Sequence, residues 1–505
     1  MTPSHTEIAI IGAGLSGLGM AKMLRAGGTE DFVVFERAAD LGGTWRDNSY
    51  PGCACDIPSV LYCYRDEPKP DWTRAYAPQA EIWEYIRGVV ARHDLRRFIR
   101  FERELTRAAF DEDRGRWELE LRSPAGEVER LTAGVLVSGC GFLADPAIPA
   151  VPGLESFSGT VFHSARWNHE HTLQGRRVAV VGTGASAIQF VPEIQPRVGR
   201  LTLFQRTPPW VLPHTNPELP VSWRRHLARR PRLQTLARAT VFSAQEALHV
   251  AFQHPRVARV IELQGRANIR RHIADPELRA RLTPDFRLGC KRILRSNAWY
   301  PALAQDNVEV ISSGIREVVA DGVLDGDGVR HEADTIIFAT GFHVTDPPIA
   351  ERIEGRDRRR LADAWAGSPR AHLGMGIAGF PNLFFLLGPN TGLGHNSVLL
   401  MIEAQLDYLR RLLRHRADTG ATVVEPTERA QAASVAAVDH GTEGSVWTAG
   451  GCRSWYLDRT GRNSALWPGS VRAYERRLGR FDPGEYTWAR PRQTDAPADS
   501  AAALA

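Results

Sequence analysis

The stretch Ile8-Ala-Ile-Ile-Gly12-Ala-Gly14-Leu-Ser-Gly17, near the start of this 505-residue chain, decides the fold. An apolar, β-branched run ends in a Gly-x-Gly-x-x-Gly turn, and a second apolar run, 32–35, ends at Glu36. This order predicts a strand, a tight turn, a helix and a strand, with the turn's backbone N–H groups facing a pyrophosphate. Glu36 suits a free ribose 2′-OH, as in FAD or NAD.

The same layout returns 170 residues later. The apolar run 178–181 leads into Gly182-Thr183-Gly184-Ala-Ser186-Ala187, and the next run, 201–204, ends at Gln205-Arg206. Arg206 suits a 2′-phosphate, as in NADP, although counting from the strand end places Gln205 opposite Glu36. One such turn is weak support for a dinucleotide site, but two in one chain predict an α/β fold with two Rossmann-like dinucleotide-binding domains. We assign the first domain to FAD and the second to NADP.

Composition limits the function classes. The chain holds 63 basic and 58 acidic residues, a net charge of +5, which is too mild to favour nucleic acid. No apolar run is long enough to cross a bilayer, and no leader pattern precedes the first strand, so we expect a cytoplasmic protein without a membrane partner. The six cysteines include no Cys-x-x-Cys, so we expect reduced thiols and no redox disulfide. We also expect no metal site.

The domains are predicted from strand patterns and breakers. We expect residues 1–145 and 346–488 to form the FAD-binding domain, and residues 146–212 and 291–345 the NADP-binding domain. Residues 213–290 are rich in Arg, poor in strand patterns and helical in periodicity, which predicts a helical insertion with a solvated basic face. Residues 489–505 are rich in Pro, Ala, Asp and Ser, and we expect a disordered tail.

Three motifs carry a family resemblance. Phe157-x-Gly159-x-x-x-His163-x-x-x-Trp167 precedes the second glycine turn, and Gly42-Gly43-Thr44-Trp45 is followed by Tyr50-Pro-Gly and Asp56. Lys291-Arg292 is followed by Trp299-Tyr300 and Asn307-Val308. Together they resemble the type I Baeyer–Villiger monooxygenases, which are class B flavoprotein monooxygenases, over nearly the whole chain. From spacing alone, His163 is a hydrogen-bonded linker residue more often than a catalytic base.

The resemblance implies roles for individual residues. Arg292 is the expected catalytic arginine, Asp56 its partner, and Lys291 an aid at the NADP 2′-phosphate. Only three lysines occur in the chain, which independently favours a role for Lys291. The candidate cofactor-binding residues are Gly12, Gly14, Gly17, Glu36, Gly43, Thr44, Trp45, Asp56, Tyr62, Gly182, Thr183, Gly184, Ser186, Arg206, Thr207, Lys291, Asn390 and Trp455. For Trp455, a place in the core is nearly as good an interpretation as contact with the NADP ribose.

The resemblance also implies a reaction. An NADPH-dependent flavin monooxygenase of this kind reduces FAD, adds dioxygen, and uses the resulting flavin peroxide to convert a ketone into an ester or lactone. The partners would be the ketone, O2 and NADPH. Two alternatives stay open: an N- or S-oxygenating flavin-containing monooxygenase, against which the Asp56 and Arg292 matches speak, and a non-catalytic NADPH-binding protein.

Overall fold

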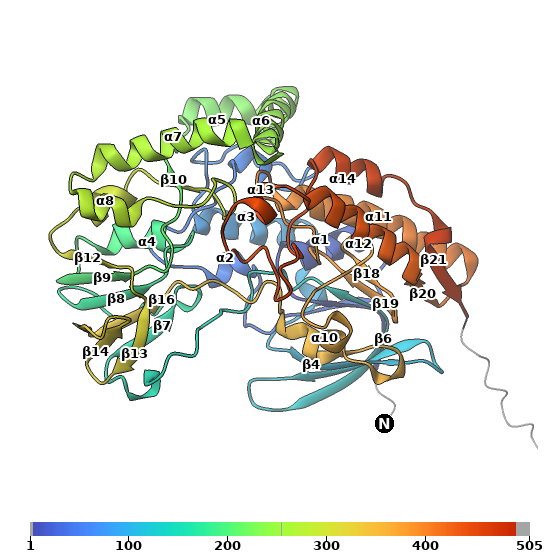
Figure 1. Cartoon of the computed structure of the whole chain (residues 1–505). Helices are drawn as coiled ribbons and strands as arrows, with labels where there is room; N and C mark the ends of the chain where they lie inside the picture. Colours follow the sequence, from blue (N-terminus) through green and yellow to red (C-terminus); the bar gives the residue numbers. More distant parts are fainter. Residues whose placement is uncertain (1–3, 254, 491–505) are drawn as a thin grey trace, which may run out of the picture.

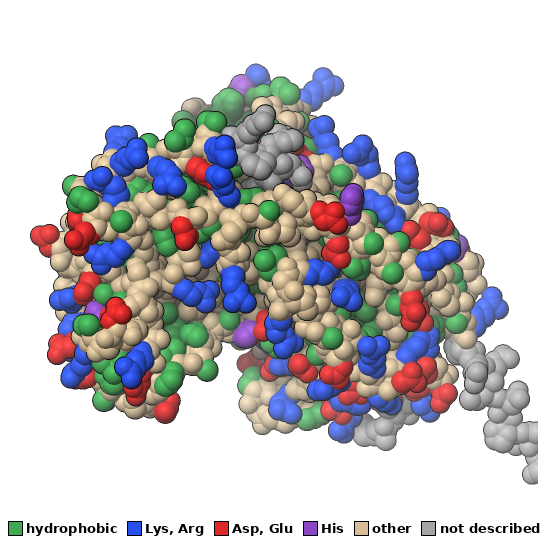
Figure 2. Space-filling model, viewed as in Figure 1, with side chains coloured by type: hydrophobic (Ala, Val, Ile, Leu, Met, Phe, Trp, Pro, Cys, Tyr) green, Lys and Arg blue, Asp and Glu red, His purple; other side chains and the backbone are tan. Residues whose placement is uncertain are grey.

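The computed structural model describes residues 4–253 and 255–490, without the side chains of 250–256. Two lobes, each with its own sheet, lie side by side, and a layer of helices covers one edge of the molecule (Figure 1). In the space-filling view a notch separates the two lobes at the opposite edge (Figure 2).

The larger sheet is built around β1 (Ser4–Ile11), which pairs in parallel with β2 (Phe32–Phe35) and β6 (Val128–Ser138). Its strand order is β17-β4-β5-β6-β1-β2-β3, with β19 added on β6 and β18 on β19. The remaining strands are β3 (Ile99–Arg100), β4 (Glu104–Asp111), β5 (Arg116–Arg122), β17 (Ile353–Glu354), β18 (Gly376–Ile377) and β19 (Phe380–Phe385). The β-branched side chains of the first apolar run are buried on both faces of β1, as expected for a parallel central strand.

The second sheet is parallel throughout and has the order β12-β9-β8-β16-β7. Its strands are β7 (Thr160–His163), β8 (Arg177–Val181), β9 (Arg200–Phe204), β12 (Val308–Ile311) and β16 (Thr335–Phe338). A small antiparallel sheet of β13 (Ile315–Val319), β14 (Gly322–Asp325) and β15 (Arg330–Glu332) accompanies it. Two short pairs complete the strands: β10 (Val211–Leu212) with β11 (Leu294–Arg295), and β20 (Val423–Pro426) with β21 (Tyr486–Ala489).

Helices cover the sheets and fill the predicted insertion. The insertion contains α5 (Val221–Ala228), α6 (Pro231–Gln253), α7 (Pro255–His272) and α8 (Pro276–Leu282). The first lobe carries α1 (Leu15–Ala26), α2 (Thr44–Asp47), α3 (Gln79–Arg92), α10 (Leu361–Trp365), α11 (Val398–Thr419), α12 (Glu428–Thr442), α13 (Val446–Ala449) and α14 (Val471–Leu478). The second lobe carries α4 (Ala187–Ile194) and α9 (Trp299–Leu303). The domain boundaries themselves stay predictions.

The chain end differs in one respect from the expectation. Ala489, the first residue of the predicted disordered tail, is the last residue of β21 and pairs with Val423. Residues 491–505 of that tail lie outside the described residues.

Candidate functional site

The first glycine turn is closed by backbone contacts. Gly12 has a φ of +101°, in the region that favours glycine, and a Cβ there would lie 3.0 Å from the carbonyl oxygen of Gly139. A Cβ on Gly17 would lie 1.9 Å from the oxygen of Gly12, so helix α1 can pack on the turn only without a side chain at this position. At Gly14 a Cβ would meet only the Cα of Gly43, at 3.7 Å. The space above Gly14 is therefore open for a ligand rather than filled by protein.

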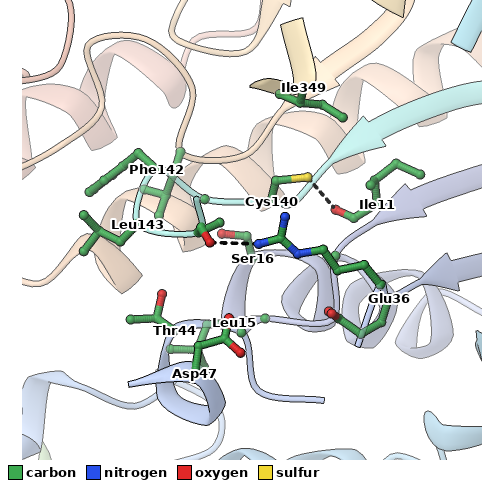
Figure 3. A pocket seen from close by; sticks show the side chains of 18 of the residues that line it. Ile11, Leu15, Ser16, Glu36, Thr44, Asp47, Cys140, Phe142, Leu143 and Ile349 are labelled. Carbon is green, nitrogen blue, oxygen red and sulfur yellow. Dashed lines mark hydrogen bonds between the residues drawn. The ribbon is translucent and has the colours of Figure 1, made fainter. Parts of the chain in front are cut away.

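A cleft opens from this turn. Figure 3 shows Phe142 and Leu143 on one side of it and Thr44 and Asp47 on the other. Glu36 also lines the cleft: one carboxylate oxygen accepts from Ala13 N at 2.9 Å, and the other accepts from Ala38 N at 3.0 Å. The open glycine face and the carboxylate at the strand end fit the pyrophosphate and ribose of FAD.

The loop after β2 supplies the far wall of the same cleft. Gly43 has a φ of +53° and precedes α2, which begins at Thr44. The indole of Trp45 donates to the hydroxyl of Tyr62 at 3.0 Å, and both residues line the cleft. The structure thus brings Gly43, Thr44, Trp45 and Tyr62 to one place, as their assignment to a flavin site requires.

The second glycine turn has the same backbone geometry as the first. Gly182 has a φ of +109°, and a Cβ there would lie 2.5 Å from the oxygen of Ala339. At Gly184 the nearest atom to a Cβ is 4.0 Å away, so this turn also leaves its second glycine open. Ser186 precedes α4 without capping it, and Thr183 Oγ1 donates to the carbonyl of Thr207 at 3.2 Å.

A pair of cations stands beside the second turn. Arg206 is exposed, while Gln205 is buried and donates through its amide to the carbonyl of Arg281 and the hydroxyl of Ser312. Burial lowers the pKa of Lys291, and the positive charge of nearby Arg206 lowers it further. Two neighbouring cations at the end of β9 form a place for an anion, and the 2′-phosphate of NADP is such an anion. Arg206, unlike the buried Gln205, is therefore exposed to a ligand at this turn.

Asp56 and Arg292 form a bidentate ion pair between the two predicted domains. Arg292 Nε donates to one carboxylate oxygen at 2.6 Å and Nη2 to the other at 2.8 Å. The side chains are 38% and 24% exposed, so the pair can meet a ligand. Arg292 Nη1 also donates to the carbonyl of Leu393 at 3.3 Å, which holds the guanidinium against the loop before α11.

Asp56 and Arg292 shift each other's pKa toward the charged forms. Burial raises the pKa of Asp56, but the charge of Arg292 more than offsets this, and the pKa lies below its ordinary value. Burial likewise works to lower the pKa of Arg292, yet Asp56 raises it above that of a free arginine. Burial raises the pKa of Tyr62, which lines the cleft, while the charge of Asp56 acts to raise this pKa and the charge of Arg292 acts to lower it. Asp56 and Arg292 are not themselves among the residues that line the cleft.

Asn390 and Trp455 are not among the residues that line the cleft at Gly12–Gly17. The amide of Asn390 donates to the carbonyls of Asn463 and Leu466, and its oxygen accepts from Arg462. Asn390 therefore fixes the 462–466 segment. Trp455 is 38% exposed and packs against Phe142 and Tyr456, so its interpretation as a core residue is wrong.

His163 fits the linker interpretation. It is buried at the end of β7, and its Nδ1 accepts from the backbone N–H of Ala165. Burial, aided by the charge of Arg166, lowers the pKa of His163 to about 4, which keeps the ring neutral. Trp167 of the same motif packs on Phe162 and Phe190, joining the motif to α4.

The expectation of reduced thiols is wrong for two cysteines. Cys290 and Cys452 form a disulfide; their Cα atoms are 6.1 Å apart and the residues are 162 positions apart in sequence. No short-range spacing could reveal a pair so distant in the chain. The bond ties the residue before Lys291 to the segment that carries Trp455, while Cys53, Cys55, Cys63 and Cys140 are free.

Two further buried residues were not among the predicted site residues. Tyr456 is buried beside Arg292, and burial raises the pKa of its hydroxyl to about 12. His395, for which a polar loop residue was the default interpretation, is buried and meets Glu246 of α6 at 3.0 Å. In the sequence, Tyr456 is visible only as part of the Trp455-Tyr456 pair, and His395 only as part of the polar segment after Leu393. Neither pattern predicts which residue the side chain contacts.

Comparison with known proteins supports the predicted family. Residues 5–239 match the profile of flavin-binding monooxygenase-like proteins. A Baeyer–Villiger monooxygenase of Streptomyces coelicolor is 48% identical over 489 residues, covering 96% of this chain and 93% of that protein. This chain belongs to the Baeyer–Villiger monooxygenase family. A second member, from Pseudomonas aeruginosa, is 46% identical over 488 residues, covering 95% of this chain and 91% of that protein.

The solved structures agree. A crystal structure of OTEMO in complex with FAD and NADP superposes with a TM-score of 0.86 at 27% identity, over 97% of this chain and 100% of that one. These findings confirm the predicted family, the fold class and the assignment as a flavin monooxygenase with FAD and NADP as cofactors. Within the described residues, no helix combines the length and apolar character needed to cross a membrane.

Proposed function

We propose that this chain binds FAD in the cleft at Gly12–Gly17 and NADPH at the turn Gly182–Ala187, and that it oxidises a ketone beside the Asp56–Arg292 pair. The reaction is ketone plus O2, NADPH and a proton giving ester or lactone, NADP⁺ and water. The observation that carries this proposal is the bidentate pair, because it fixes a cation between the two predicted nucleotide-binding domains.

Arg292 supplies a permanent positive charge. Its pKa is raised by Asp56, so the guanidinium stays protonated at every working pH. Bound FAD supplies the transfer of electrons from NADPH and the activation of dioxygen. The fixed cation stabilises negative charge on oxygen at the reacting centre, and the Leu393 carbonyl and Asp56 keep it from turning away.

The nucleotide units supply binding and orientation. Glu36 is already held by Ala13 N and Ala38 N, and it offers its carboxylate to a ribose hydroxyl without having to move. Arg206 and Lys291 would take the 2′-phosphate, and Trp455 on the tethered segment would contact the ribose. The division into domains at 145, 212, 290 and 345 and a cytoplasmic location belong to the same proposal.

The test is product analysis. Purified protein with NADPH is given linear, cyclic and aryl ketones, and mass spectrometry looks for products heavier by one oxygen atom. An ester or lactone from any ketone series supports the proposal. Oxygenation confined to an amine or a thioether would instead establish the N- or S-oxygenase, and a protein that stays colourless after added FAD would favour the non-catalytic alternative.

A further inference from the structure

The helical insertion carries a surface that the proposed reaction does not use. Residues 221–272 contain eleven arginines, no lysine and two glutamates, whereas the rest of the chain holds 52 basic against 56 acidic residues. The positive net charge of the protein therefore resides in α5, α6 and α7. Figure 2 shows Lys and Arg side chains gathered along the upper edge, where these helices lie in Figure 1.

The two glutamates do not neutralise the outer arginines. Glu246 accepts from His395 and Asn396 on the inner side of α6. Glu262 accepts from Leu288 N at 3.1 Å and pairs with Arg287 at 3.3 Å. Both carboxylates therefore contact the body of the protein rather than the exposed arginines of these helices.

Helix α7 exposes apolar side chains, although it also buries Ala258 and Ile269 in the core. Its buried face includes the polar side chains of Glu262 and Asn268, and Asn268 donates to the carbonyl of Val211. Its exposed face carries Val257, Val260 and Leu263, which are 42%, 67% and 66% exposed. The three follow one another at intervals of three residues, so they form one stripe.

Further exposed apolar and basic side chains accompany the stripe. Six of the eleven large hydrophobic side chains found exposed in the described residues belong to these three helices: Val221, Trp223, Leu236, Val257, Val260 and Leu263. Arg259, Arg270 and Arg271 are exposed on α7 itself. The composition of the insertion predicts a solvated basic face, but its three helices also expose these apolar side chains.

We propose that the outer face of α5–α7 docks on an anionic lipid surface. Apolar side chains with interspersed arginines suit a helix that lies in the plane of the headgroups. A second copy of the chain is disfavoured, because a two-fold interface would set the exposed arginines of one copy, among them Arg259, Arg270 and Arg271, against those of the other. Nucleic acid is disfavoured because the Val–Val–Leu stripe offers nothing to a phosphate or a base edge.

The inference is independent of the proposed reaction and is tested without measuring activity. The holoenzyme is floated with vesicles of phosphatidylcholine alone, or of phosphatidylcholine and phosphatidylglycerol in equal parts. We expect flotation with the anionic vesicles only, and its loss at high salt, because ions screen exposed charges. No flotation, or equal flotation with neutral and anionic vesicles, would overturn the proposal.

Variants separate the apolar and the basic contributions. The double variant Val260→Ser and Leu263→Ser should bind anionic vesicles at least about tenfold more weakly, from the lost apolar burial. The matched control is Val128→Ser with Val329→Ser, two valines 47% and 55% exposed outside the insertion, which should bind as wild type. Replacing Arg259, Arg270 and Arg271 with Gln should weaken binding about fivefold per arginine.

Two results would count against lipid as the occupant. If the Val260→Ser and Leu263→Ser variant floats like wild type, the stripe is not the contact. If size-exclusion chromatography shows a dimer that this variant dissociates, the surface joins two copies of the chain instead.

Discussion

The turns at Gly12–Gly17 and Gly182–Ala187 have the same layout: each follows a strand, has a first glycine with positive φ, and leaves space beside its second glycine. They differ at the third position of the motif and in the residue that follows the next strand. Gly17 admits no Cβ, whereas the fully buried Ala187 stands in its place in the second turn. Glu36 is fixed by backbone N–H groups, whereas Arg206 is exposed beside Lys291. The same backbone geometry thus occurs at both turns, and the charge at the end of the second strand differs between them.

Among the variants that test this comparison, the largest effect, on flavin content, is expected from Gly17→Ala. Its Cβ would lie 1.9 Å from a backbone oxygen that cannot move aside, so the turn would open and flavin would be lost. We expect purified protein without the yellow flavin absorbance. Gly27→Ala, at the other end of α1, is the control, because its Cβ would meet nothing closer than 3.4 Å; stoichiometric flavin in Gly17→Ala would refute the steric argument.

The next effect concerns the cations of the second turn. Arg206→Ala and Lys291→Ala should each raise the KM for NADPH by about 10- to 100-fold, the loss expected for a hydrogen bond between charged groups. The KM for NADH should stay unchanged, because NADH lacks the phosphate. Steady-state kinetics with both nucleotides measures this, and equal losses for NADH and NADPH would remove the 2′-phosphate from the explanation.

A smaller effect is expected from Glu36→Gln. The amide keeps one acceptor oxygen but loses the charge that pairs with Arg46 at 3.0 Å and offers itself to the ribose. FAD affinity, measured by flavin fluorescence on titration, should fall about 5- to 10-fold. The NADPH-to-NADH preference should not change, and a change in it would mean that the two turns are not independent. Glu30→Gln, a carboxylate at the surface, is the control.

The smallest effect is a pH dependence at the second turn. Burial and Arg206 lower the pKa of Lys291 below the ordinary 10.5, so its proton is lost earlier on the alkaline side. The protonated form binds the phosphate, and the KM for NADPH should therefore rise with pH before an ordinary lysine would titrate. Lys291→Arg should flatten this rise, because arginine stays charged. The same slope in wild type and variant would exclude Lys291 as its source.

The fold could be predicted because its signals are local. Gly12 and Gly182 each stand at the end of a short apolar run, and the geometry they require involves only the next few residues. The charge of Arg206 was likewise visible, but its choice over Gln205 needed the structure, since only the folded chain shows Gln205 turned inward.

The site was harder to predict because its parts are far apart in sequence. Asp56 and Arg292 are separated by 236 positions, and only the family resemblance paired them beforehand. Nothing in the sequence pointed to the Cys290–Cys452 bond, to Tyr456 beside Arg292, or to Glu246 reaching His395 from the insertion. Such contacts arise where separate elements converge, and no periodicity or spacing rule encodes them.

The central claim is that Arg292, held by Asp56 where the two units meet, directs oxygen to a carbonyl carbon. The most direct measurement follows ester formation under ¹⁸O2 in wild type, Arg292→Ala and the control Arg287→Ala, which removes an arginine from an ion pair in the insertion. We expect one labelled oxygen in the ester from wild type and control. In Arg292→Ala, ester formation should fall about 100- to 1,000-fold while NADPH is still consumed and hydrogen peroxide appears. Labelled ester from Arg292→Ala at the wild-type rate would contradict the account.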